Sequence, residues 1–272
     1  MKKPTKKKLL LFIPLALLLA CAIAIGVMYF TIGGGGVISI LSSVRLRTDM
    51  MQAALYEAPN GFTLPYRIYV PENMDEAQPY PVVLFLQGAG HSGTDNRKQT
   101  DVFGVMHVLL SPKNRAKYPC ILIAPQAPDG RDWNDELVTP ALMCILEQTA
   151  ANYPVDTARI YVTGLSMGGF GTWGMLAAYP DYFAAGAPVC GGWDVEDAPL
   201  LRDIPIWAFH GAKDPVVDPD YTRDMVKALE DLGSTRIKYT EYPNEGHWSW
   251  GRAYYEPALY EWMFAQRKTI SQ

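Results

Sequence analysis

The sequence predicts an α/β fold in which a mostly parallel central sheet is covered by helices on both faces. Short apolar runs without charge recur along the chain, as at residues 81–86 and 120–124, and such runs are typical of strands buried on both faces. Segments whose apolar residues follow helical spacing alternate with these runs. Only 15 residues, 190–204, separate two of the later strands, so no large lid is expected there.

The predicted elements follow one another from residue 51 onward. Strands are predicted at residues 51–56, 62–70, 81–86, 120–124, 159–163, 185–189, 204–209 and 236–242. Helices are predicted at residues 102–110, from Thr139 as N-cap and Pro140 as first residue, at 167–179 and at 220–232. Open sheets of this kind bind ligands at the carboxyl ends of their strands, so residues that directly follow a strand are the functional candidates.

The composition suits one globular domain, which we place at residues 48–272. The chain has 272 residues, of which 49% are hydrophobic and 19% charged, and this is enough apolar material for one sizeable core. The net charge is −4, but the first eight residues include five lysines, so residues 9–272 carry −9. An acidic domain repels polyanions, and no nucleic-acid partner is expected.

The N-terminal segment predicts a membrane anchor. Residues 9–32 contain no charged residue, and as a helix they would span about 36 Å, against about 30 Å of bilayer hydrocarbon. The lysines before this segment predict a cytoplasmic start and an extracytoplasmic domain. We therefore expect a lysine-rich start and transmembrane helix at 1–32 and a glycine-rich linker at 33–47. A cleaved signal peptide, or lipidation at Cys21, stays open as an alternative and would give a secreted or lipid-anchored domain.

The motif Gly164-Leu165-Ser166-Met167-Gly168 predicts a catalytic nucleophile. It follows a predicted strand and begins a predicted helix, which is the context that a G-x-S-x-G nucleophile requires. A tight turn there would present Ser166 at the top of the sheet, because glycines on either side let the chain bend without a clash. The alternative interpretation is a serine that only caps the helix.

A catalytic serine needs a base, and the base needs an orienting acid. After a G-x-S-x-G serine the chain order is acid and then histidine. Asp214 follows a predicted strand 48 residues after Ser166, and His247 comes 33 residues after Asp214. We therefore predict a Ser166, Asp214 and His247 triad, and expect the rivals Asp218 and Asp220 to be solvated or capping acids.

The other three histidines do not fit this order. His210 precedes the acid and ends a predicted strand, so we interpret it as a packing residue. His91 lies in a glycine-rich loop and His107 in a predicted helix. No histidine, cysteine or acidic residues have metal-ligand spacing, so neither a metal nor a cofactor is expected.

Two backbone N–H groups are predicted to stabilise an oxyanion, those of Ala89 and Met167. Ala89 lies in the glycine-rich turn after the strand at 81–86, and Met167 follows the nucleophile. Gln87, Trp133 and Trp248 are predicted to contact the substrate, although ordinary packing explains the tryptophans equally well.

Together these motifs resemble the compact α/β-hydrolases that include feruloyl and acetyl esterases, polyhydroxybutyrate-depolymerase-like proteins and predicted peptidases related to the prolyl oligopeptidase catalytic domain. The resemblance covers residues 62–264. Its marks are Tyr66-Arg67-Ile68-Tyr69-Val70-Pro71, Gly88-Ala89-Gly90, Gly93-Thr94-Asp95-Asn96, Ala124-Pro125-Gln126, the Ser166 motif, His210-Gly211 with Asp214, and Gly246-His247. One departure is Gln87, where such proteins usually have histidine.

The resemblance implies an α/β-hydrolase that cleaves small-molecule or polymer-linked carboxylic esters through an acyl-enzyme, outside the cytoplasm. Two other functions stay open. One is a serine peptidase related to the prolyl oligopeptidase catalytic domain. The other is a non-catalytic, membrane-tethered binding module, against which the ordered triad counts. The sequence does not predict the oligomeric state.

Overall fold

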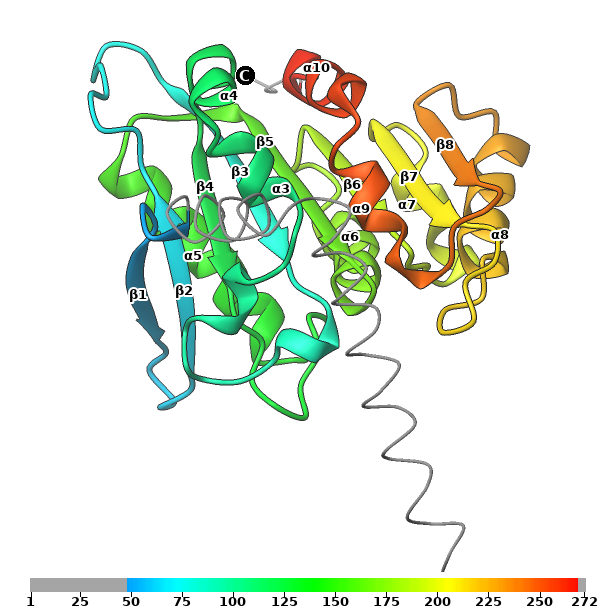
Figure 1. Ribbon diagram of the computed structural model, residues 1–272, viewed down its shortest axis with the longest axis horizontal. Coiled ribbons are helices and arrows are strands. Elements are labelled where there is room, and N and C mark those ends of the chain that lie inside the picture. The colour runs from blue at the N-terminus through cyan, green and yellow to red at the C-terminus, as the bar shows by residue number, and fades with distance from the viewer. Residues whose placement is uncertain (1–47, 269–272) are drawn as a thin grey trace, which may run out of the picture. The chain divides into compact units, whose positions relative to one another are not determined.

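The computed structural model describes residues 48–268, which form an eight-stranded sheet with helices on both faces (Figure 1). This arrangement confirms the predicted α/β-hydrolase fold class. The predicted membrane anchor at 1–32 and linker at 33–47 lie outside the described residues. Between residues 48 and 268, no helix is long and apolar enough to cross a bilayer.

The sheet is antiparallel at one end and parallel in the rest. Its strands are β1 (Gln52–Glu57), β2 (Thr63–Tyr69), β3 (Tyr80–Leu86), β4 (Ile121–Pro125), β5 (Val155–Leu165), β6 (Ala185–Val189), β7 (Ile206–Gly211) and β8 (Ile237–Tyr242). They lie in the order β1-β2-β4-β3-β5-β6-β7-β8. β2 is antiparallel to both neighbours, and every pair from β4 to β8 is parallel. All eight predicted strands are present.

The described helices are α3 (Val105–Leu109), α4 (Pro112–Lys117), α5 (Val138–Asn152), α6 (Met167–Ala178), α7 (Ala198–Leu201), α8 (Asp220–Asp231), α9 (Trp250–Ala253) and α10 (Pro257–Ala265). Short 3-10 turns are η1 (Ala89–His91), η2 (Lys98–Thr100), η3 (Val195–Asp197) and η4 (His247–Ser249). The predicted helices correspond to α3, α5, α6 and α8, and the sequence did not predict α4, α7, α9 or α10.

The predicted start of α5 is wrong by two residues. The helix begins at Val138, and the Thr139 hydroxyl donates to the carbonyl of Trp133 (2.8 Å) instead of capping the helix. Asp135 Oδ1 accepts hydrogen bonds from the N–H groups of Leu137 (2.9 Å) and Val138 (3.4 Å) in its place. An acidic side chain therefore satisfies the exposed donors at this helix start.

The pleat of β3 divides the core into two layers. Val82, Leu84 and Leu86 pack with residues of α5, α6 and α8 on one face. Val83 and Phe85 pack with residues of α3 and α10 on the other. Consecutive side chains of a strand point to opposite faces, so a strand with helices on both sides is apolar throughout. Burial of each such side chain contributes about 1.5–3 kcal/mol.

The parallel strands bring the candidate residues to one edge of the sheet. β5 leads into the turn that holds Ser166, β7 into the loop that holds Asp214, and β8 into the segment that holds His247. The connection between β6 and β7 contains only η3 and α7, so no large lid is built from it.

Candidate active site

Ser166 lies in the turn between β5 and α6, and its backbone is strained. Its φ of 54° and ψ of −118° lie outside the regions that residues other than glycine favour. Its N–H donates to the carbonyl of Val189 (3.0 Å), and its own carbonyl accepts from the N–H of Phe170 (3.0 Å). This sharp strand-to-helix turn presents the hydroxyl at the end of the sheet.

Two glycines make the turn sterically possible. A Cβ at Gly164 would lie 2.3 Å from the carbonyl oxygen of Gly168, and a Cβ at Gly168 would lie 1.9 Å from the carbonyl oxygen of Leu86. Both distances are far shorter than van der Waals contact, so any side chain would push the backbones apart. The first turn of α6 is therefore held directly against the end of β3.

A chain of hydrogen bonds joins the three predicted triad residues. His247 Nε2 lies 3.0 Å from Ser166 Oγ, and His247 Nδ1 lies 2.7 Å from Asp214 Oδ2. The serine comes from the end of β5, the acid from the loop after β7, and the histidine from η4. The His247 side chain is 13% exposed and that of Asp214 is fully buried. His247 is therefore open to a substrate, whereas Asp214 is shielded from water.

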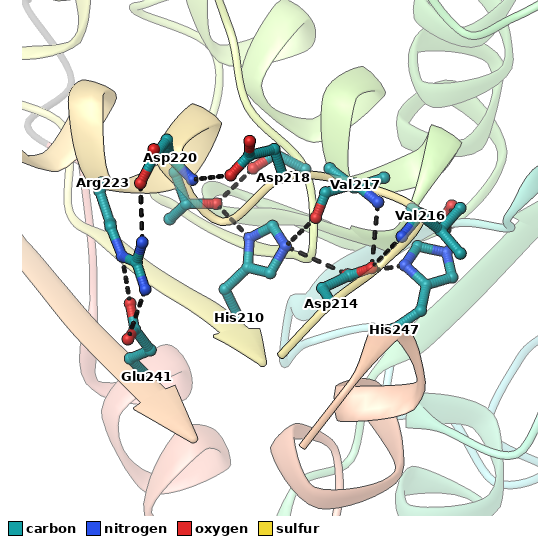
Figure 2. A network of polar contacts seen from close by, with 12 residues as sticks. His210, Asp214, Val216, Val217, Asp218, Asp220, Arg223, Glu241 and His247 are labelled. Carbon is teal, nitrogen blue, oxygen red and sulfur yellow. Dashed lines mark hydrogen bonds and ion pairs between the residues drawn. The ribbon is translucent and has the colours of Figure 1, made fainter. Parts of the chain in front are cut away.

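Asp214 stays ionised in this buried position because it receives several hydrogen bonds. Its Oδ1 accepts from the N–H groups of Val216 (2.8 Å) and Val217 (3.0 Å), and its Oδ2 accepts from His247 (Figure 2). Burial alone would raise the pKa of Asp214, but the bonds from His247, Val217 and Val216 outweigh it and lower the pKa. The carboxylate is therefore available to orient the imidazole at neutral pH.

The predicted oxyanion donors lie at two neighbouring helix starts. Ala89 begins η1 and Met167 begins α6, and the first N–H groups of a helix have no intrahelical partner. A Cβ at Gly88 would lie 3.5 Å from the Cβ of Ser166, so the turn that carries Ala89 lies against Ser166. These positions make the two N–H groups candidates for stabilising negative charge beside Ser166.

Within residues 48–268, one group of three side chains offers metal-ligating atoms close together, namely Cys190, Asp214 and His247, whose atoms lie within 4.8 Å of one another. Two of these residues are already hydrogen-bonded to each other. Burial raises the pKa of the Cys190 thiol to about 12, which disfavours the thiolate that a metal would need. The arrangement therefore fits proton transfer better than metal binding.

Comparison with known proteins identifies the family. The sequence model of the putative esterase family matches residues 61–199. The chain belongs to the putative esterase family. The matched segment includes Ser166 and the turn with Ala89, and it ends before Asp214 and His247. The resemblance to compact esterases that the motifs predicted is thereby confirmed.

Three relatives show how far the similarity reaches. The structure of a thermostable esterase superposes with a TM-score of 0.78 at 37% identity, over 82% of this chain and 64% of that one. A bifunctional acetylxylan esterase/xylanase of Neocallimastix patriciarum is 32% identical over 116 residues, which are 39% of this chain and 17% of that protein. An uncharacterized secreted protein of Arthroderma benhamiae is 25% identical over 213 residues, 66% of this chain and 22% of that protein. The chain thus spans less than a quarter of these two curated relatives.

In this member of the putative esterase family, two of the predicted substrate contacts are buried. Gln87 and Trp133 are both 0% exposed. The Trp133 indole N–H donates to the Gln87 carbonyl (2.9 Å), and its ring packs against Gly171. With its amide nitrogen toward Pro125, the Gln87 side chain donates to that carbonyl (2.8 Å). The predicted substrate contacts of Gln87 and Trp133 are therefore wrong, because neither side chain reaches the surface. Both instead pack behind the turn that carries Ala89.

Trp248 lies where a substrate can touch it. It is 77% exposed, and its ring stacks on that of Trp250 with centroids 5.4 Å apart. The Trp250 ring in turn meets the His247 imidazole edge to face, with centroids 5.3 Å apart. The two tryptophans form an aromatic surface beside the base, which we call the tryptophan pair.

The sequence missed two features of the site. The N–H groups of Val216 and Val217 hold Asp214, and no side-chain pattern reveals them. His210 was interpreted as a packing residue, yet its Nε2 lies 3.2 Å from Asp214 Oδ2. Its position four residues before the acid, at the end of a strand, is a signal that could have shown the contact.

Asp214→Asn should lower kcat for a p-nitrophenyl ester by about 10⁴-fold, because the amide no longer accepts from His247 in the correct tautomer. Asp218→Asn is the matched control. Asp218 is exposed and its Oδ1 only accepts from the N–H of Asp220 (3.0 Å), so this variant should stay close to wild type. Steady-state kinetics of both variants check the assignment, and the opposite ranking would move the acid to Asp218.

Proposed function

We propose that the chain is a serine hydrolase that cleaves carboxylic esters through an acyl-enzyme on Ser166. The observation that carries the proposal is the unbroken hydrogen-bonded chain from Ser166 through His247 to Asp214. A strained turn presents the serine, and the family match covers that turn. Binding alone does not need such a chain, which counts against a purely tethering role.

In the first half of the reaction, the Ser166 oxygen attacks the ester carbonyl carbon while His247 Nε2 takes the hydroxyl proton. The imidazolium that forms is stabilised by the buried Asp214 carboxylate. Negative charge develops on the carbonyl oxygen, where the N–H groups of Ala89 and Met167 donate to it. The tetrahedral intermediate collapses, the ester C–O bond breaks, and the alcohol leaves with the proton from His247.

In the second half, water replaces the alcohol. His247 takes a proton from the water, whose oxygen attacks the acyl carbon, and the same two N–H groups stabilise the second oxyanion. Collapse returns the proton from His247 to Ser166 Oγ and releases the carboxylic acid. The reaction needs one base that is reused, which is why a single histidine between serine and acid suffices.

The surroundings of the triad favour an ester attached to a ring or polymer. Three exposed apolar side chains either adjoin a triad residue in the chain or contact a neighbour of one: Val216, Tyr221 and Trp248. The Val216 N–H binds Asp214, Tyr221 packs on Phe170 one turn after the serine, and Trp248 follows His247. An aromatic face suits a sugar or phenolic ring. The acetylxylan esterase relative agrees with this substrate class.

Ser166→Ala should abolish turnover of p-nitrophenyl acetate and of feruloyl and acetylated-xylan esters, by roughly 10⁵–10⁶-fold, because the nucleophile is lost. A fluorophosphonate probe should label wild type at Ser166 and leave the variant unlabelled. Unchanged activity of the variant, or labelling of another residue, would contradict the assignment of Ser166 as the nucleophile. Peptide substrates in the same panel separate the alternatives, since faster peptide than ester cleavage shows a peptidase and no turnover at all shows a binding module.

Trp248→Ala should lower kcat/KM for feruloyl or polymer-linked esters about 3- to 10-fold through the loss of one stacking contact, and leave p-nitrophenyl acetate little changed. Leu55→Ala is a matched control, because Leu55 is also exposed (53%) but lies on β1 at the far end of the sheet. Equal losses on small and large esters would contradict a role in binding the ring.

We also propose that residues 9–32 anchor this domain outside the cytoplasm. The uncharged run and the five preceding lysines support that orientation. The relative from Arthroderma benhamiae is described as secreted, which agrees with an extracytoplasmic domain. An outward-facing site would meet polymers that cannot enter the cell.

External protease added to intact cells that express the full chain should remove the domain and leave a membrane-bound remnant. A cytoplasmic marker protein, protected in the same sample, is the control for cell integrity. Protection of the domain would refute the orientation. Release into the medium, with a new N-terminus between Ala20 and Val44, would show a cleaved signal peptide instead of an anchor.

A further inference from the structure

His210 is fully buried at the end of β7, directly beside the acid of the triad (Figure 2). Its Nε2 lies 3.2 Å from Asp214 Oδ2 and 3.1 Å from the carbonyl oxygen of Val217. Its Nδ1 lies 2.7 Å from Thr222 Oγ1. Both ring nitrogens therefore have polar partners although the side chain has no contact with water.

The partners of His210 determine which nitrogen carries a proton. Nε2 faces a carboxylate and a peptide carbonyl, and both can only accept. A bare lone pair there would be repelled by both oxygens, so Nε2 carries a proton and donates. The Thr222 hydroxyl lies between Nδ1 and the carbonyl of Gly191 and can donate its single proton to either. Burial lowers the pKa of His210 and so disfavours the doubly protonated ring. In the neutral ring the one proton is on Nε2, and the Thr222 hydroxyl then donates to Nδ1.

This proton completes the hydrogen bonding of Asp214. The N–H groups of Val216 and Val217 donate to Oδ1, whereas His247 and His210 donate to Oδ2. Two donors on each oxygen match the four lone-pair directions of a carboxylate. The four donors prevent rotation of the carboxylate, and the one from His210 shares Oδ2 with the base.

We propose that His210 is a positioning residue of the triad. Its Nε2–H holds Asp214 Oδ2 against His247 and limits how strongly that oxygen attracts the His247 proton. The contact acts on the base through Asp214, since His210 does not touch Ser166 or a substrate. This inference rests on the proposed ester hydrolysis and assigns to that reaction a fourth side chain.

One further charged residue, Glu241, lies opposite His210 on the neighbouring strand. Glu241 on β8 is paired with Arg223 of α8 through two hydrogen bonds (2.8 and 2.9 Å), and Arg223 also binds Asp220 (2.7 Å). The bond from Arg223 lowers the pKa of Glu241 to about 2. Glu241 is therefore ionised throughout the activity range, and a change at His210 is transmitted to the base through Asp214.

Two substitutions separate this role from packing. His210→Gln places an amide N–H near the position of Nε2 and keeps the donor to Asp214. His210→Asn is shorter, places its amide near Nδ1 and loses that donor. We expect His210→Asn to lower kcat for p-nitrophenyl acetate roughly 10²-fold with little change in KM, because a misplaced acid misorients the base.

When kcat/KM is plotted against pH, the acidic limb reports the protonation of the essential base in the free enzyme. It should move to higher pH in His210→Asn, because Asp214 with one donor fewer attracts the imidazole proton more strongly. His210→Gln should keep the wild-type limb and recover most of kcat. A packing role would lower the thermal stability of both variants without separating their pH profiles. Equal losses in the two variants, or an unmoved limb in His210→Asn, overturn the proposal.

A measurement on the wild-type protein covers the case in which a variant fails to fold. The ¹⁵N shifts of labelled histidines should show His210 protonated on Nε2 throughout the pH range of activity. A bare Nε2 in that range overturns the proposal. Absence of ester turnover by wild type would refute the proposed function instead, and the NMR experiment would still decide whether His210 donates to Asp214.

Discussion

The close contact between the start of α6 and the end of β3 is the constraint on which the site depends. The carbonyl of Leu86 occupies the space where any side chain at position 168 would lie, so the helix starts directly against the strand. The strained backbone of Ser166 lies at this contact, and the turn with Ala89 lies beside it. The strain costs on the order of 1–3 kcal/mol, and the buried strands on either side of the turn offset it.

The second determinant of the site is a buried carboxylate that its neighbours keep charged. Asp214 gives up hydration, and donors from its own loop, from β7 and from η4 replace that water with fixed dipoles. Such dipoles need no rearrangement when the imidazole becomes positive, whereas water would. His247 therefore has two different surroundings. On the side of Asp214 it is held by a buried, hydrogen-bonded carboxylate, and on the side of the tryptophan pair it is open to a substrate.

Most of the fold could be predicted from the sequence, because a strand buried on both faces is recognisable as an uninterrupted apolar run. β3 and β4 are apolar throughout, and their ends are predicted within one or two residues. β5 begins at Val155 in a stretch of mixed polarity, so its first residues are not part of an apolar run and were not predicted as strand. The short helices α4 and α10 both begin with proline, which in sequence reads as a break.

The proximity of Ser166, Asp214 and His247 was predictable because chain order and local motifs constrain it. The direction in which a single side chain points cannot be predicted in the same way. Trp133 and Trp248 are the same residue type in the sequence, yet Trp133 is fully buried behind the turn that holds Ser166 and Trp248 is exposed. His210 was assigned to packing for the same reason. Its partners come from α8, from the Asp214 loop and from Gly191 through Thr222, and only the folded chain brings them together.

The position of β8 has a consequence for how this enzyme fails. Among the described strands, β8 lies at one end of the sheet and pairs with β7, and the segment after it carries His247. Sheet edges open more readily than sheet centres, so fraying of this one strand would carry His247 away while the turn of Ser166 stayed folded. Heat or mild denaturant would then abolish activity before most of the secondary structure is lost. Cooling, or removal of the denaturant, would restore activity without refolding of the core.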